Sequence, residues 1–122
     1  MAELGVEHVD FVAVPTTDVE RAKRFYGETL GLELERDTPI GAEYRAGQVT
    51  LEIVDPTGYG MPFAPNPAGF ALRVPDVAEA RKELEAEGVE FDAETYDTGV
   101  CHMAVFKDPD GNTLVLHRRY AP

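Results

Sequence analysis

The chain repeats one pattern of apolar residues, helix-capping residues and glycines at an offset of 58 residues, measured from Asp18 to Asp76. The first copy, FVAVPTTDVERAKRFYGETLGLELERD, begins at Phe11, and the second, GFALRVPDVAEARKELEAEGVEFDAE, begins at Gly69. An aspartate before apolar residues at helical spacing is typical of a helix N-terminus, so each copy predicts a strand, a capped helix and another strand. Repetition at about half the chain length indicates two copies of one supersecondary unit.

Further strand candidates follow each helix and give both halves the same order of elements. They are the runs at residues 32–36, 42–46 and 49–54, and then at 89–95, 101–107 and 113–119. The order βαβββ therefore occurs twice, in modules of about residues 7–54 and 69–119 within one domain spanning 1–122. The connection between them, residues 55–68, is rich in proline and glycine. It is either a simple linker or a functional loop.

The charge and length of the chain exclude several kinds of partner. Among its 122 residues, 23 are Asp or Glu and 11 are Lys or Arg, which gives a net charge of −12. This charge repels nucleic acid and anionic lipid over most of the surface, and no apolar run approaches the ~20 residues that cross a bilayer. Cys101 is the only cysteine, and the first ten residues lack a signal-peptide pattern. We expect a cytoplasmic protein that binds neither nucleic acid nor membrane.

Motifs in both halves occur in an order that resembles one superfamily. In the first half Asp18 is followed by Phe25, Tyr26 and the sequence LGL at 30–32, and in the second F-x-DPDGN occupies residues 106–112. Paired βαβββ units with these motifs resemble the vicinal-oxygen-chelate superfamily, which includes glyoxalase I, bleomycin-resistance proteins and extradiol dioxygenases. The resemblance covers nearly the whole chain. It implies an α+β fold of two tandem βαβββ modules, whose curled mixed sheets surround a cavity and carry helices on the outer face.

Metal-dependent members of this superfamily hold a divalent ion at four inward positions, on the first and fourth strand of each module. By the resemblance, these positions fall on Phe11, Glu52, Gly69 and Val115. Only Glu52 could bind a metal, and a metal site needs three or more ligands around one point. The chain therefore lacks the standard four-ligand site, and we reject glyoxalase I itself as its function.

Alternation along the strands predicts two faces for each sheet. The residues expected beneath the helices are Val12, Val14, Leu51, Ile53, Phe70, Leu72, Leu114 and Leu116. The residues expected on the cavity face are Phe11, Ala13, Glu52, Gly69, Ala71, Arg73, Val115 and His117. If Lys107 pairs with Asn112 across the DPDG turn, His102 opposes His117 and both histidines join the cavity face. A slip of one residue would turn one histidine away.

Glu52, His102 and His117 are the candidate catalytic residues. Histidine titrates near neutrality, so two histidines could divide acid and base work. Together with Glu52 they could instead form a displaced site for a divalent metal such as zinc, iron, nickel or manganese. A purely structural role for the histidines is the third possibility.

Phe11, Arg73, Tyr44 and Val115 are the candidate substrate-binding residues. The forked donors of Arg73 could bind a carboxylate or phosphate, or Arg73 could pair with Glu52. Tyr44 could stack on a flat ligand at the mouth of the cavity, although aromatic side chains are more often ordinary packing.

The sequence thus predicts a small-molecule-binding protein of the glyoxalase, bleomycin-resistance and dioxygenase type, with a small organic ligand as partner. Three activities stay open: an enzyme of unknown substrate, a metal-dependent lyase, isomerase or dioxygenase with a displaced site, and sequestration of a ligand without turnover. The resemblance also implies a homodimer, in which Glu52 of one chain meets Arg73, His102 and His117 of the other.

Overall fold

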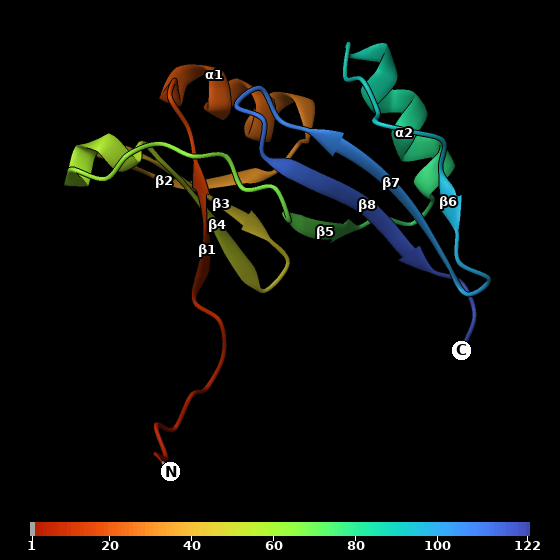
Figure 1. Ribbon diagram of the computed structural model, residues 1–122, viewed down its shortest axis with the longest axis horizontal. Helices are drawn as coiled ribbons and strands as arrows, with labels where there is room; N and C mark the ends of the chain where they lie inside the picture. Colours follow the sequence, from red (N-terminus) through yellow and green to blue (C-terminus); the bar gives the residue numbers. More distant parts are fainter. Residues whose placement is uncertain (1) are drawn as a thin grey trace.

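The computed structural model describes residues 2–122 and contains two four-stranded mixed sheets (Figure 1). The first module consists of β1 (Phe11–Pro15), α1 (Val19–Lys23), its π-helical continuation η1 (Arg24–Thr29), β2 (Glu33–Thr38), β3 (Gly41–Ala46) and β4 (Val49–Val54). The second consists of β5 (Phe70–Arg73), α2 (Val77–Ala86), β6 (Tyr96–Asp97), β7 (Cys101–Lys107) and β8 (Thr113–Arg119). A short 3-10 helix, η2 (Pro56–Tyr59), lies between the modules.

Both modules have the same strand order, β1-β4-β3-β2 and β5-β8-β7-β6. In each, the first strand runs parallel to the last, and the other pairs are antiparallel. The predicted α+β fold of two tandem βαβββ modules is therefore confirmed. No helix in residues 2–122 is long and apolar enough to cross a membrane.

Both helices begin at the aspartates that the repeat predicts. The Asp18 carboxylate accepts a hydrogen bond from the backbone N–H of Arg21 at 3.1 Å, and the Asp76 carboxylate accepts one from the N–H of Glu79 at 3.0 Å. Each bond satisfies an N–H group that has no partner within its helix. The two modules therefore start their helices by the same local chemistry.

One apolar core joins the two modules. The side chains predicted beneath the helices are buried or partly buried there: Val12, Val14, Leu51, Ile53, Phe70, Leu72, Leu114 and Leu116. The ring of Phe106 on β7 is fully buried and lies 6.5 Å from that of Phe25 and 5.1 Å from that of Phe91. Because Phe25 belongs to the first module, the helix-covered sides of both sheets share this core. In Figure 1 both helices lie along the upper side of the sheets.

The strand predicted at residues 89–95 is largely absent. Only Phe91 forms a bridge, to Phe106, and β6 begins later, at Tyr96. Arg81 on α2 holds this segment instead: its Nη1 donates to the Ala93 carbonyl at 2.9 Å, and its guanidinium lies 4.6 Å from the centre of the Phe91 ring. The segment is therefore held both by α2 and by isolated backbone contacts with β7, among them the Asp92 N–H, which donates to the Val105 carbonyl at 2.9 Å.

The predicted pairing of Lys107 with Asn112 is wrong by one residue, because Lys107 pairs with Thr113. Asn112 belongs to the turn: its N–H donates to the Asp108 carboxylate at 2.9 Å, and its carbonyl accepts from the Asp108 N–H at 2.9 Å. The turn thus occupies residues 108–112. Lengthening a turn by one residue shifts the register of every pair along the hairpin.

Candidate functional site

The open face of the first sheet carries two adjacent carboxylates. Ala13 lies opposite Glu52, and Glu52 lies opposite Glu43. The Glu43 carboxylate accepts from Arg36 Nε at 2.9 Å, whereas Glu52 makes no hydrogen bond or ion pair with any of residues 2–122. On the same face, at the start of β1, the side chain of Phe11 is 53% exposed. An unpaired carboxylate beside an exposed aromatic ring can receive a donor or cation from outside the chain.

The open face of the second sheet carries one row of side chains across all four strands. From β6 to β5 this row is Tyr96, Met103, His117 and Arg73. Arg73 is exposed and has no hydrogen-bond or ion-pair partner in the described part of the chain. The next row is apolar and consists of Val105, Val115 and Ala71. This face therefore offers a free guanidinium and an imidazole beside apolar side chains.

His102 lies on the opposite face of this sheet from His117. It pairs with Arg118, while His117 pairs with Met103, and residues one position apart on a strand point to opposite faces. The prediction that the two histidines face each other in the cavity is therefore wrong. The register shift at the DPDG turn is the cause.

The imidazole of His102 belongs to a polar cluster near the start of α2. Its ring lies 4.6 Å from the ring of Tyr120, and its Nε2 lies 3.4 Å from Asp97 Oδ2. The Tyr120 hydroxyl donates to Asp97 Oδ1 at 2.8 Å. The backbone N–H of Gly99 and this hydroxyl hold the pKa of Asp97 below its ordinary value. Each member of the cluster thus has a partner within the chain.

Tyr44, a predicted ligand contact, faces the core instead. It lies opposite Leu51, is 2% exposed, and its hydroxyl donates to the Lys23 carbonyl at 3.2 Å. Burial raises the pKa of Tyr44, so the hydroxyl stays protonated and keeps donating. Tyr44 therefore fastens the helical segment to the first sheet and does not reach the open face.

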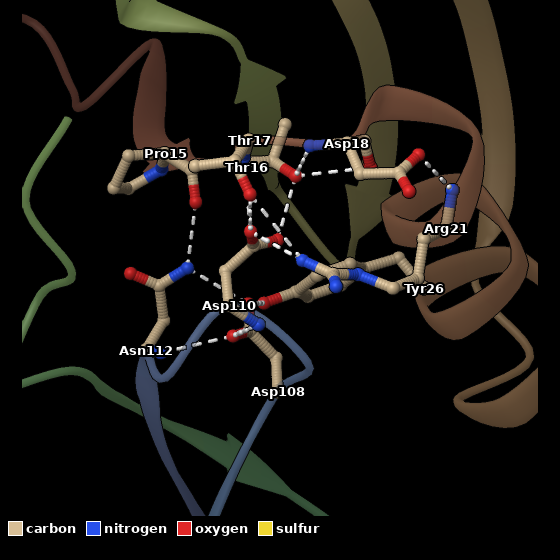
Figure 2. A network of polar contacts seen from close by, with 9 residues as sticks. All are labelled: Pro15, Thr16, Thr17, Asp18, Arg21, Tyr26, Asp108, Asp110 and Asn112. Atoms are coloured by element: carbon tan, nitrogen blue, oxygen red, sulfur yellow. Dashed lines mark hydrogen bonds and ion pairs between the residues drawn. The ribbon is translucent and has the colours of Figure 1, made fainter.

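A partly buried polar network, which the sequence pattern does not indicate, joins the DPDG turn to the first module (Figure 2). The Asp110 carboxylate accepts from the Thr16 hydroxyl at 2.6 Å, the Thr17 N–H at 2.9 Å and Arg21 Nη2 at 2.7 Å. Burial opposes ionisation of Asp110, but the hydrogen bonds from both threonines and the Arg21 charge outweigh it and hold its pKa below the ordinary value. The turn is therefore bound to the first module by a charged hydrogen-bond network. We call the contacts of Asp110 with Thr16, Thr17 and Arg21 the Asp110 lock.

A second pair of contacts extends this lock. The Tyr26 hydroxyl donates to the Asp108 carboxylate at 2.7 Å, and Asn112 Nδ2 donates to the Pro15 carbonyl at 2.8 Å. Burial, with the neighbouring Asp108 charge, raises the pKa of Tyr26 far above its ordinary value. The sequence predicts a turn at DPDGN and a family motif there, but not these contacts, because their partners lie 82 and 97 positions away along the chain.

A family model described as Glyoxalase/Bleomycin resistance protein/Dioxygenase superfamily matches residues 8–116. The chain belongs to this superfamily. One similar solved structure is the crystal structure of TnmS3, an antibiotic binding protein from Streptomyces sp. CB03234. Its sequence is 31% identical to that of this superfamily member, its TM-score is 0.78, and the match covers 96% of this chain and 99% of TnmS3. A superfamily protein from Sphaerobacter thermophilus is 27% identical, with a TM-score of 0.78, over 93% and 98% of the two chains. An uncharacterised protein from Mycolicibacterium smegmatis is 33% identical over 110 residues, which cover 89% of this chain and 91% of the relative.

The four-ligand metal site does not fit this superfamily member. Of the four positions only Glu52 offers a donor, and at Gly69 the backbone excludes any side chain: φ is +68°, and a Cβ would overlap the Thr113 carbonyl. The predicted displaced metal site of Glu52, His102 and His117 does not form either, since His102 lies on the opposite face of the sheet from His117. Among residues 2–122 no three His, Cys, Asp or Glu side chains gather closely enough to hold a metal.

Proposed function

We propose that this superfamily member binds and holds an aromatic small molecule, without converting it, against its open sheet faces. The unpaired charges on these faces carry the proposal: Glu52 on the first sheet, and Arg73 beside His117 on the second. Ligand pockets are mostly apolar, with a few placed polar groups that orient the ligand. Phe11 and Val115 supply apolar surface beside these charges. The likeness to TnmS3, an antibiotic binding protein, supports an antibiotic as the ligand.

We further propose that two copies of the chain enclose each ligand. Within one chain both faces are uncovered, since the side chains of Phe11 and Tyr96 are 53% and 62% exposed. The first sheet of one copy, placed over the second sheet of its partner, would bring Glu52 opposite Arg73 and His117. Opposite charges on facing surfaces favour this pairing over others, and a two-fold axis would create two equivalent cavities. Unlike the predicted site, this cavity has no place for His102.

Calorimetric titration with a panel of aromatic antibiotics, bleomycin among them, tests the proposal. We expect at least one compound to bind, and recovery of that compound unchanged after prolonged incubation. Glu52→Gln should weaken binding about 10- to 100-fold, because hydrogen bonds to charged groups contribute about 1.5–3 kcal/mol. Recovery of a modified compound would contradict sequestration and would support the predicted catalytic roles of Glu52 and His117.

The two histidines provide a matched pair for the same titration. We expect His117→Ala to weaken binding several-fold, because His117 lies on the open face between Met103 and Arg73. His102→Ala should leave affinity unchanged, because His102 lies on the other face beside Asp97. Equal losses from the two variants would contradict the placement of the ligand on the open face.

A further inference from the structure

The charged strand residues on the open face of the second sheet are all basic. The four strands of this sheet, which the structure describes in full, contain one acidic residue, Asp97. Asp97 pairs with His102 and therefore lies on the other face. Besides Arg73, the open face carries Lys107 and Arg119. In a chain with a net charge of −12, this face is a local exception that attracts a negatively charged group.

Arg73 holds the free positive charge on this face. Lys107 pairs with the Asp92 carboxylate at 2.8 Å, and Arg119 donates to a backbone carbonyl at the end of the chain at 2.9 Å. Arg73 is exposed, forms no hydrogen bond or ion pair with any of residues 2–122, and lies beside His117 of β8. The two parallel N–H donors of a guanidinium match the two oxygens of a carboxylate. Because a guanidinium carries one positive charge, Arg73 balances a carboxylate and not a doubly charged phosphate.

One row across the open face of the first sheet carries an excess of negative charge. From β1 to β2 this row is Ala13, Glu52, Glu43 and Arg36. Directly opposed residues have Cβ atoms about 4.5–5.5 Å apart, so the side chains of Glu52 and Glu43 are neighbours. Arg36 donates only to the Glu43 carboxylate, at 2.9 and 3.4 Å. Two carboxylates thus share one cation, and Glu52 attracts a positively charged group.

Enclosure between two sheets makes both free charges unfavourable unless each one is paired. In the proposed dimer, Glu52 of one copy and Arg73 of the other line the same cavity. Removing water from an ionised group without giving it a partner is strongly unfavourable. A neutral ligand that filled this cavity would desolvate both groups and pair with neither. A ligand with a single charge would compensate only one of them.

We propose that the ligand is an aromatic zwitterion, whose carboxylate binds Arg73 and whose protonated amine binds Glu52 of the other copy. This assignment names the ligand class of the proposed site, so it rests on the proposed function and on its dimer. The aromatic ring lies between the two charged ends, against Phe11 and Val115. A reversed ligand would place its carboxylate beside Glu52 and its amine beside Arg73. Because like charges repel, the two residues also fix the orientation of the ligand.

Calorimetric titration with matched derivatives of two antibiotics tests the ligand class. The probes are ciprofloxacin and ampicillin, two aromatic antibiotics that each carry one carboxylate and one basic amine. Each is compared with its methyl ester, its N-acetyl derivative and the form that is blocked at both ends. We expect a zwitterion to bind about 10- to 100-fold more tightly than either of its singly blocked forms, because each of these loses one charge-assisted contact. Equal affinities for all four forms would overturn the assignment.

Variants that remove one charge assign each end of the ligand. Arg73→Gln should weaken binding of the zwitterion and of the N-acetyl derivative, which keeps the carboxylate, about 10- to 100-fold, and leave the methyl ester unchanged. Glu52→Gln should weaken the zwitterion and the methyl ester, and leave the N-acetyl derivative unchanged. Combining each variant with each derivative isolates one contact at a time. A purely structural effect of either substitution would weaken all four forms alike, and that result would contradict the assignment.

A double variant and a matched control complete the series. In Glu52→Gln plus Arg73→Gln, the doubly blocked form should bind at least as tightly as the zwitterion, because no free charge remains to be paired. Arg118→Gln is the control: Arg118 belongs to β8 of the same sheet, but it pairs with His102 and lies on the helix-covered face. This control should leave all four affinities unchanged. A zwitterion preference that persists in the double variant would overturn the assignment.

The titrations separate failure of this inference from failure of the proposed function. Binding of neutral aromatic antibiotics, with no preference for a zwitterion, overturns the assignment of the ligand class and leaves sequestration standing. If no compound of the whole panel binds, the proposed function itself is contradicted, and the ligand class falls with it. Selective loss of the carboxylate contact in Arg73→Gln and of the amine contact in Glu52→Gln supports both.

Discussion

Gly69→Ala is expected to lower the free energy of unfolding by about 3 kcal/mol or more. Gly69 has a φ of +68°, and a Cβ there would overlap the carbonyl oxygen of Thr113. The left-handed conformation costs a non-glycine residue about 1–2 kcal/mol, and displacing packed neighbours costs about 1–3 kcal/mol more. Urea unfolding followed by circular dichroism measures the loss.

Gly88→Ala separates the two causes of this loss. Gly88 has a φ of +92°, but a Cβ there meets nothing within 4 Å. Only the conformational cost remains, so we expect a loss of about 1–2 kcal/mol. If both variants lose equally, steric exclusion at Gly69 is wrong, and the backbone there could accept a metal-binding side chain after all.

Asp110→Asn is expected to lower the free energy of unfolding by about 2–4 kcal/mol, because it removes the negative charge that Arg21, Thr16 and Thr17 surround. Removing one partner of a buried charged network leaves the other groups desolvated and poorly paired. Asp92→Asn is the control: Asp92 forms an exposed ion pair with Lys107 at 2.8 Å, and such pairs contribute about 0–1 kcal/mol. Equal losses would contradict the lock.

The parent and the Asp110→Asn variant can also be compared as a function of pH. The pKa of Asp110 is lower in the folded chain than in the unfolded one, so its stabilisation is fully present above the unfolded value of about 3.9. This stabilisation is lost as the pH falls through the pKa that Asp110 has in the folded chain. Below about pH 4 we therefore expect parent stability to decline more steeply than that of Asp110→Asn. Parallel curves would show that Asp110 contributes no pH dependence.

The open faces that form the proposed site are a direct consequence of the fold. Side chains alternate along each strand, so the residues that bury one face of a sheet leave the residues between them on the open face. Val14 and Ile53 lie beneath the first helix, which fixes Ala13 and Glu52 on the opposite face. The Asp110 lock lies outside these faces, but it holds the second module against the first. Its loss should therefore weaken ligand binding only in proportion to the fraction unfolded.

The sequence by itself determined what depends on neighbours along the chain. The caps at Asp18 and Asp76, the two βαβββ modules and the inward face of Leu114 and Leu116 all follow from local spacing. The open-face positions of Glu52 and Arg73 follow from the same alternation.

Only the tertiary structure decided the register of the last hairpin and the faces of His102 and Tyr44. The local sequence would allow Asn112 to pair with Lys107 as the first residue of the last strand. It remains in the turn because its side chain bonds the Pro15 carbonyl and accepts from the Asn66 N–H, 97 and 46 residues away. The period of a strand fixes which residues share a face, but contacts from distant segments fix where the strand begins, and one residue of shift moves a histidine from the ligand face to the other side.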